Sequence, residues 1–362
     1  MKYAIYPYLD KFALLVDYII KQKKYNITTL IKPKVWDAVD PGYDNVLMTS
    51  SFNDAVENVD AVIFLDDVHY SDCIRKIARC IKMKTDVVCC VSVKNDDYSY
   101  LTELAKQYGV KITLCDGKDH EIINKFAGRI LRYHTQECVV AAVGSIFNGG
   151  AGYDSEFVLK LAKSFKSKGY AVTVLGSDRN FDLCGFHPSL PFDFSDLDEN
   201  PDVFVLKLNA YYNYIQMIEK PDVIILQLPQ EGLAKMFDSL PYGFGIRSFI
   251  ISQAIDVNYF SLVWGVEKST DENFRNISVM FEKRFGFKVD SVAISDCYVD
   301  YHESLSKGKV ICMQVDEDDV KDTLEFIKKS DECENSDILY CRYSDASIGD
   351  IISENCIEKL SS

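Results

Sequence analysis

Short apolar, β-rich runs alternate with amphipathic segments along the whole chain, and this alternation constrains the fold more than any other feature of the sequence. In the first amphipathic segment, Phe12, Val16 and Ile19 recur at the spacing of one helical face. A strand, a helix and a second strand form a βαβ unit. Repeated alternation therefore predicts an α/β protein with two doubly wound, mainly parallel-sheet domains.

Residues 1–134 are expected to form a Rossmann-like domain, whose size is ordinary for this fold. The expected strands are Tyr3–Tyr6, Ile27–Ile31, Ala61–Leu65, Asp86–Val91 and Val110–Leu114. The expected helices are Lys11–Lys24, Ser71–Lys84, Tyr98–Tyr108 and His120–Tyr133.

The pattern restarts at Cys138 after a short junction at Thr135–Glu137, so residues 138–362 are expected to form a second α/β domain. Its expected strands are Cys138–Val143, Ala171–Leu175, Asp222–Leu228, Tyr259–Trp264 and Val289–Ile294. Its expected helices are Ser155–Lys168, Val203–Glu219, Phe244–Ile255 and Asp271–Phe285. An acidic extension adds a strand, a helix, a strand and a helix at Lys309–Val315, Val320–Lys329, Ile338–Cys341 and Ile348–Leu360.

The charge balance argues against partners that are polyanions. The chain has 40 basic and 55 acidic side chains, a net charge of -15, which disfavours nucleic acid and anionic membranes as partners. The acidic run Asp316–Asp319 directly precedes Val320 and is typical of a helix N-terminus. It lacks the glycine and the glutamate spacing of a calcium loop.

Cysteine usage predicts reduced thiols and a cytoplasmic protein. The chain has 12 Cys and five His, but no Cys-x-x-Cys pair, so we expect no zinc or iron–sulfur site. Neither a signal peptide nor a membrane span is expected. Cys89 and Cys90 lie in an apolar run and are expected to be small buried side chains. A metal or redox role is therefore the third of three function classes.

The end of the first strand carries Tyr6-Pro7-Tyr8, where a dinucleotide-binding domain needs a glycine-rich turn. These bulky residues predict that a dinucleotide does not bind there. Asp66 and Asp67 follow a later strand. They either face a crevice at the carboxyl ends of the strands or cap the helix that begins near Ser71.

The strongest local motif is the glycine-rich run from Val143 to Ser155, between a predicted strand and a predicted helix. Gly144 and Gly149 have the spacing of a P-loop, but Gly150 and Ala151 stand where the lysine and the hydroxyl residue belong. The sequence thus predicts a degenerate P-loop-like domain. Its amides either hold an anion or small ligand, or the turn only permits close helix–sheet packing. The candidate ligand-binding residues here are Asn148, Gly149, Gly150, Gly152 and Ser155.

The strand that corresponds to Walker B is degenerate as well. Its end offers Gln227 and Pro229 in place of a metal-binding aspartate, and Asp222 lies at the opposite end. We therefore expect no bound metal, no magnesium-dependent hydrolysis and no required cofactor, with a nucleotide or an anion as the alternative ligand.

Other polar residues follow predicted strand ends and extend the candidate site. They are Ser177, Asp178, Arg179, His187, Gln230 and Arg247. The two arginines are expected to pair with a carboxylate or phosphate ligand, or simply with surface acids. His187 either exchanges protons or has a structural role before Pro188. No Ser/His/Asp or Cys/His set can be assembled from the spacing, so catalytic residues stay unassigned.

Several motifs resemble a clostridial family of peptide maturation system proteins. They include Gly169-Tyr170-Ala171-Val172, Gly176-Ser177, Gly185-Phe186-His187-Pro188, Ile5-Tyr6-Pro7-Tyr8, Pro221-Asp222-Val223-Ile224-Ile225, Phe244-Gly245-Ile246, Ser252-Gln253-Ala254 and Arg284-Phe285-Gly286-Phe287-Lys288-Val289-Asp290. The resemblance implies association with a radical SAM maturase and a small Cys-rich, bacteriocin-like precursor peptide. Two departures stand out: Lys32–Asp37 lacks the expected glycines, and Asp154 stands near a position where relatives often have lysine.

These observations favour two functions. The first is an accessory binding or scaffold protein in the maturation of a ribosomally synthesised, modified peptide, with the precursor peptide or the maturase as partner and a homodimer as a possible assembly. The second is a nucleotide- or anion-using enzyme that acts on the peptide at the turn Gly144–Ser155.

Overall fold

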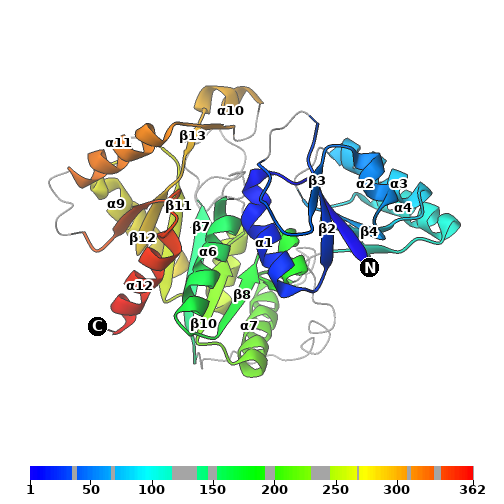
Figure 1. Ribbon diagram of the computed structural model, residues 1–362. Coiled ribbons are helices and arrows are strands. Elements are labelled where there is room, and N and C mark those ends of the chain that lie inside the picture. The colour runs from blue at the N-terminus through cyan, green and yellow to red at the C-terminus, as the bar shows by residue number, and fades with distance from the viewer. Residues whose placement is uncertain are drawn as a thin grey trace. The chain divides into compact units, whose positions relative to one another are not determined.

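The computed structural model describes residues 1–34, 39–66, 70–115, 137–145, 153–191, 200–229, 245–266, 269–307, 311–329 and 336–361. Within these ranges the chain forms two compact units, each with its own parallel sheet and interleaved helices (Figure 1). The α/β fold class with two doubly wound sheets is confirmed. The expected helix His120–Tyr133 and most of the expected junction at Thr135–Glu137 lie outside the described residues.

The first unit comprises Met1–Lys118 and Asp178–Phe186. Its six strands are ordered β3-β2-β1-β4-β5-β6, so the order reverses between β1 and β4, as in doubly wound sheets. The strands are β1 (Lys2–Tyr6), β2 (Asn26–Ile31), β3 (Leu47–Thr49), β4 (Ala61–Phe64), β5 (Asp86–Cys89) and β6 (Ile112–Leu114). The helices are α1 (Ala13–Gln22), α2 (Phe52–Glu57), α3 (Tyr70–Lys82) and α4 (Asn95–Tyr108).

The segment Asp178–Phe186 belongs to the first unit, although the residues before and after it belong to the second. It contains the 3-10 helix η2 (Arg179–Cys184). The Gln22 side chain on α1 donates a hydrogen bond to the carbonyl of Cys184 at 2.8 Å. The Tyr18 and Phe186 rings meet edge to face at 5.1 Å. These contacts join segments that are far apart in the sequence.

The second unit comprises Asp119–Ser177 and His187–Ser362. Its sheet has the order β15-β12-β11-β7-β10-β8-β9. The strands are β7 (Val139–Ser145), β8 (Val172–Gly176), β9 (His187–Pro188), β10 (Val223–Gln227), β11 (Tyr259–Trp264), β12 (Ser291–Ile294) and β15 (Leu339–Arg342). The helices are α6 (Tyr153–Ser167), α7 (Pro201–Glu219), α8 (Ile246–Ala254), α9 (Asp271–Phe285), α10 (Tyr301–Lys307), α11 (Glu317–Lys328) and α12 (Ile348–Ser361).

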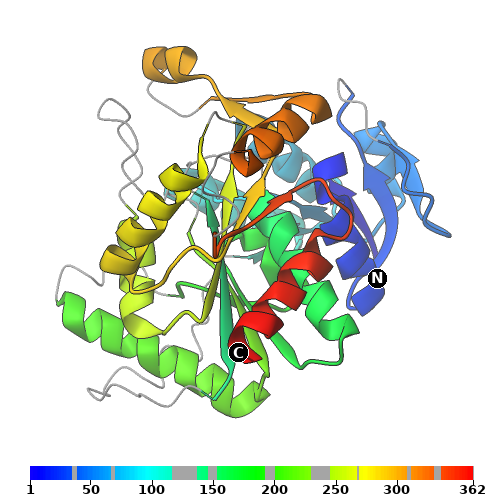
Figure 2. The same ribbon diagram turned by 90° about the vertical axis from the view of Figure 1, so that its left-hand side faces the viewer.

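Helices cover both faces of this second sheet (Figure 2). Helices α6 and α12 lie side by side on one face, and α7, α8 and α9 lie on the other. Gly349 permits the close approach of α12 to α6, because a Cβ there would lie 2.6 Å from the carbonyl oxygen of Lys160. Ser164 on α6 then reaches Ser353 on α12 at 2.8 Å.

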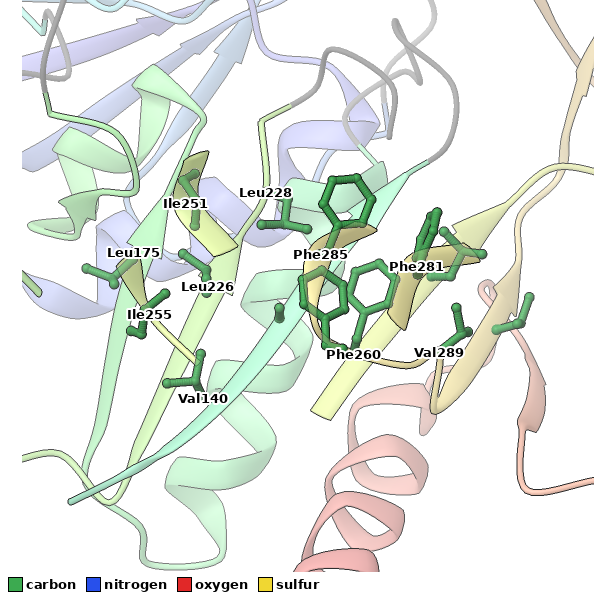
Figure 3. Packing of buried hydrophobic residues seen from close by; sticks show 14 of the residues in the cluster. Val140, Leu175, Leu226, Leu228, Ile251, Ile255, Phe260, Phe281, Phe285 and Val289 are labelled. Atoms are coloured by element: carbon green, nitrogen blue, oxygen red, sulfur yellow. The ribbon is translucent and has the colours of Figure 1, made fainter. Parts of the chain in front are cut away.

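The main core of the second unit fills the space between the sheet and α7–α9 (Figure 3). Phe260 on β11 packs against Phe281 on α9, with ring centroids 5.6 Å apart, and Phe281 meets Phe285 at 5.3 Å. Each of these side chains is fully or almost fully buried. Burial of one such side chain stabilises the fold by roughly 1.5–3 kcal/mol, so this aromatic group anchors α9 to the sheet.

The C-terminal extension differs from the expectation in one respect. The expected strand Lys309–Val315 forms β14 (Cys312–Gln314), which leaves the main sheet and pairs antiparallel with β13 (Cys297–Val299). β13, α10, β3 and α2 were not expected from the sequence, because each is short and carries little periodic signal. The acidic run Asp316–Asp319 lies at the N-terminus of α11, as expected.

Among the described residues, no helix is long and apolar enough to cross a bilayer.

Candidate functional site

The candidate site lies where β7, β8 and β10 end and α6 begins. The central residues of the glycine-rich turn, Asn148, Gly149, Gly150 and Gly152, lie outside the described residues, and so does Gln230. The turn's flanks are described: β7 ends at Ser145, and α6 begins at Tyr153. β10 pairs with β7 so that Gln227 is opposite Val143. The residue expected in place of a Walker B aspartate therefore lies beside the strand that leads into the turn.

Gln227 connects three elements at this edge. Its side chain is completely buried. Its Oε1 accepts a hydrogen bond from the backbone N–H of Ser177 at 2.9 Å, and its Nε2 donates to Ser155 Oγ at 3.1 Å. Ser177 Oγ in turn donates to the carbonyl of Leu228 at 3.3 Å. The end of β10 is thus tied to the end of β8 and to the first turn of α6, and both ends of the Gln227 amide are engaged by the protein.

Asp154, the residue before Ser155, contributes a buried carboxyl group. It lies in the first turn of α6 and is 4% exposed. Burial raises its pKa from an ordinary value of 3.8 to about 7, and no other cause contributes. Desolvation disfavours the charged form of a carboxyl, which is why burial raises this pKa. With a pKa of about 7, the side chain changes protonation near neutral pH.

The chemistry of the described part of the site follows from these groups. Ser155, Ser177 and Gln227 form a neutral network, and Asp154 adds either a proton or a negative charge. This set contains no cation to balance a phosphate, in contrast to a working P-loop. Across the described parts of the chain, no group of three or more His, Cys, Asp or Glu residues is arranged to hold a metal ion.

The other candidate residues occupy separate places. His187 Nε2 lies 2.5 Å from Glu219 Oε1, and this contact with His187 holds the pKa of Glu219 below its ordinary value. Arg247 is exposed in the first turn of α8. Asp178 and Arg179 belong to the first unit, where Asp178 caps η2 by accepting a hydrogen bond from the N–H of Asn180 at 2.9 Å. These contacts involve groups other than Gln227, Ser155 and Ser177.

In the first unit, bulky side chains fill the end of β1, as expected from Tyr6-Pro7-Tyr8. Tyr6 and Tyr8 are 3% and 1% exposed. The backbone N–H of Asp66, after β4, donates to Asn180 Oδ1 at 2.8 Å, whereas Asp67 lies outside the described residues. A glycine turn for a dinucleotide is therefore replaced by packed aromatic residues.

A polar cluster that sequence reasoning did not find lies beside Tyr6. Lys76 Nζ lies 2.7 Å from Asp72 Oδ2 and 4.1 Å from the centre of the Tyr6 ring, and it also donates to the Tyr6 hydroxyl. The Tyr6 hydroxyl donates to Asp72 at 3.2 Å. Burial raises the pKa of Asp72, but the hydrogen bonds from Lys76 and Arg75 lower it, and the pKa stays below its ordinary value. The i, i+4 spacing of Asp72 and Lys76 was the available signal, but such pairs are common on helices.

The described thiols behave as expected of small apolar side chains. All are buried except Cys312, which is partly exposed. Burial raises the pKa of Cys80 to about 12. Cys89 and Cys90 are 1% and 0% exposed.

Comparison with known proteins bears on the fold. No known family model matches the sequence, and no curated protein sequence matches it. Among solved structures, the chain is similar to a DUF1611 family protein from Anabaena variabilis, with a TM-score of 0.60, 12% identity and coverage of 99% of each chain. At this identity the likeness shows the fold alone, and it extends over both units.

Two weaker likenesses are to D-lactate dehydrogenases. The enzyme from Salmonella has a TM-score of 0.24 at 14% identity, over 100% of this chain and 96% of that chain. The enzyme from Lactobacillus jensenii has a TM-score of 0.25 at 13% identity, over 99% and 94%.

Proposed function

We propose that this protein is a cytoplasmic accessory binding protein, without nucleotide hydrolysis of its own, in the maturation of a ribosomally synthesised, modified peptide. The observation that carries the binding role is the buried Gln227 side chain at the end of β10. Its amide is engaged by Ser155 and Ser177 at the place where hydrolysis requires a carboxylate for Mg²⁺. This edge of the sheet therefore supports binding better than hydrolysis.

The peptide context of the proposal comes from the sequence motifs that resemble peptide maturation system proteins, such as Gly185-Phe186-His187-Pro188. The partner is then a precursor peptide or a radical SAM maturase. Thermal denaturation with each partner tests this role, because a ligand that binds only the native state stabilises it by about 2.7 kcal/mol at a hundred times its dissociation constant. An unchanged melting temperature with both partners would contradict the proposal.

A nucleotide- or anion-using enzyme that acts on the peptide is the second candidate, and Asp154 is the observation that favours it. A buried carboxyl group with a pKa of about 7 can take up or release a proton at neutral pH. The lack of a cation in the set formed by Asp154, Ser155, Ser177 and Gln227 weighs against a phosphate ligand.

The two candidates differ in an expected hydrolysis result. With Mg²⁺ and either ATP or GTP, we expect no steady phosphate release above a protein-free blank, because the site lacks a P-loop lysine and a Walker B aspartate. A coupled phosphate assay measures this. Steady release that disappears in Gly149→Val would overturn the accessory role and establish the enzyme.

A further inference from the structure

The second unit contains a short β-ribbon that is not part of its seven-stranded sheet. β13, which is labelled in Figure 1, forms a two-stranded antiparallel ribbon with β14, and Tyr298 is opposite Met313. Val315 N donates to Asp296 O at 2.9 Å, which makes these two residues a hydrogen-bonded pair. Bonded and non-bonded pairs alternate along an antiparallel ribbon, so Tyr298 and Met313 form the next bonded pair. The residues between bonded pairs turn their N–H and C=O groups outward.

The two edges of this ribbon differ. On β13, the outward carbonyl of Cys297 accepts a hydrogen bond from Val266 N at 2.6 Å. Gly265 is so close that a Cβ there would lie 2.5 Å from the same oxygen. This edge is therefore covered.

The edge of β14 is open within the described part of the chain, where β13 is its single neighbouring strand. Cys312 and Gln314 are the residues of β14 that turn their backbone groups outward. Gln314 is exposed and Cys312 is partly exposed. An exposed strand edge of this kind is a template for a further strand.

The side chains beside the open edge suit an apolar contact. Tyr298 and Met313 are 37% and 47% exposed, and they lie on the same face of the ribbon because they are directly opposite. Cys297 and Val299 occupy the other face and are buried. An aromatic ring beside a flexible thioether is a good surface for small apolar side chains.

The net negative charge around the ribbon favours a positively charged partner. Residues 296–329 contain nine acidic and five basic side chains. Asp296 Oδ2 accepts a hydrogen bond from the Gln314 side chain at 3.0 Å. The acidic turn Asp316–Asp319 begins at the residue after Val315; within it, Glu317 pairs with Arg342 and Asp318 pairs with Lys321. Edge-to-edge pairing of two copies would place two ribbons of net negative charge side by side and is disfavoured. A positively charged strand is favoured.

We propose that the open edge of β14 binds an extended, lysine- or arginine-rich segment of a partner polypeptide, which adds a third strand to the ribbon. Backbone groups of Cys312 and Gln314 hold the added strand, Tyr298 and Met313 contact its apolar side chains, and the acidic turn contacts its cations. This inference rests on the proposed function, since it names the surface on which the accessory protein holds an extended peptide.

The test uses a short fluorescent peptide of alternating lysine and valine, and a matched peptide of glutamate and valine. Anisotropy titrations should show saturable binding of the lysine peptide and at least about tenfold weaker binding of the glutamate peptide. Hydrogen exchange should slow at Cys312 and Gln314 when the lysine peptide binds. Equal binding of both peptides, or protection elsewhere in the chain alone, would overturn the inference.

Gln314→Pro removes an outward N–H without removing a donor from the bonded pairs inside the ribbon, and Gln314→Ala is its matched control because it keeps that N–H. We expect about tenfold weaker binding for Gln314→Pro and a change below about threefold for Gln314→Ala. If Gln314→Pro fails to fold, backbone N-methylation of the peptide tests the same bonds on the unaltered protein. Unchanged affinity in either test would overturn the inference.

Charge is tested by Asp319→Asn, with Asp202→Asn in the first turn of α7 as control. The first should weaken binding about twofold and the second should leave it unchanged. If the precursor peptide binds and Gln314→Pro leaves that affinity unchanged, the inference fails and the proposed function stands. If the precursor peptide binds no form of the protein, the proposed function itself fails.

Discussion

Asp154→Asn should stabilise the second unit at pH 8. The native carboxyl has a pKa of about 7, whereas the unfolded chain has the ordinary value of 3.8. The native state therefore binds more protons than the unfolded state between these values, and the stability falls as pH rises, by about 1.4 kcal/mol per pH unit. The loss is complete above pH 7 and reaches up to about 4 kcal/mol. Asparagine cannot ionise, so the variant avoids it.

Urea denaturation from pH 5 to pH 8 measures this effect. In a Trp36→Phe background the remaining tryptophan, Trp264, reports the core of the second unit, where it is 2% exposed. The stability gain of Asp154→Asn should grow with pH and level off above pH 7. Glu156→Gln is the control on the same helix, because it removes a carboxylate that lies 2.9 Å from Lys160 and should lower stability slightly. Equal destabilisation of Asp154→Asn at every pH would show that the carboxylate is held by hydrogen bonds.

The architecture followed from the sequence because it depends on periodicity, which is local. The alternation of apolar runs and amphipathic segments predicted the strands of both sheets except the short β3 and β9, and Tyr259–Trp264 even has the expected bounds. The place of Asp178–Phe186 in the first unit was not predicted, because it depends on contacts with residues such as Tyr18 and Gln22, more than a hundred positions away. No local pattern encodes such a contact.

The sequence indicated which residues to consider for a candidate site, but it did not indicate how they contact one another. Strand ends and helix starts identified Ser155 and Ser177, and Gln227 was noted as a substitute for an aspartate. That Gln227 bridges the other two required the sheet order, which places β10 between β7 and β8. The raised pKa of Asp154 was also beyond sequence reasoning, because it depends on burial alone and not on a neighbour in the chain.

Gln227→Leu should destabilise the second unit by roughly 2 to 6 kcal/mol. Leucine keeps the buried volume and removes both hydrogen bonds, so the part-buried Ser177 N–H and the buried Ser155 hydroxyl each lose a partner. Each such loss costs about 1–3 kcal/mol. Urea denaturation followed by Trp264 fluorescence measures the sum. Gln253→Leu on α8 is the control, since its partly exposed amide donates to Ser252 at 3.2 Å, and it should cost below about 0.5 kcal/mol.

Gln227→Glu separates the hydrogen bonds from the shape of the side chain. When protonated, glutamate can accept from the Ser177 N–H and donate to Ser155 Oγ, so the variant should be close to the parent in stability at pH 5. Burial favours the protonated form of the native state, and the unfolded chain ionises above about pH 4.3. The stability of Gln227→Glu should therefore fall relative to the parent as pH rises to 8. If Gln227→Leu and Gln227→Glu both match the parent at pH 8, the amide does not organise this edge of the sheet, and the observation that favours binding over hydrolysis is lost.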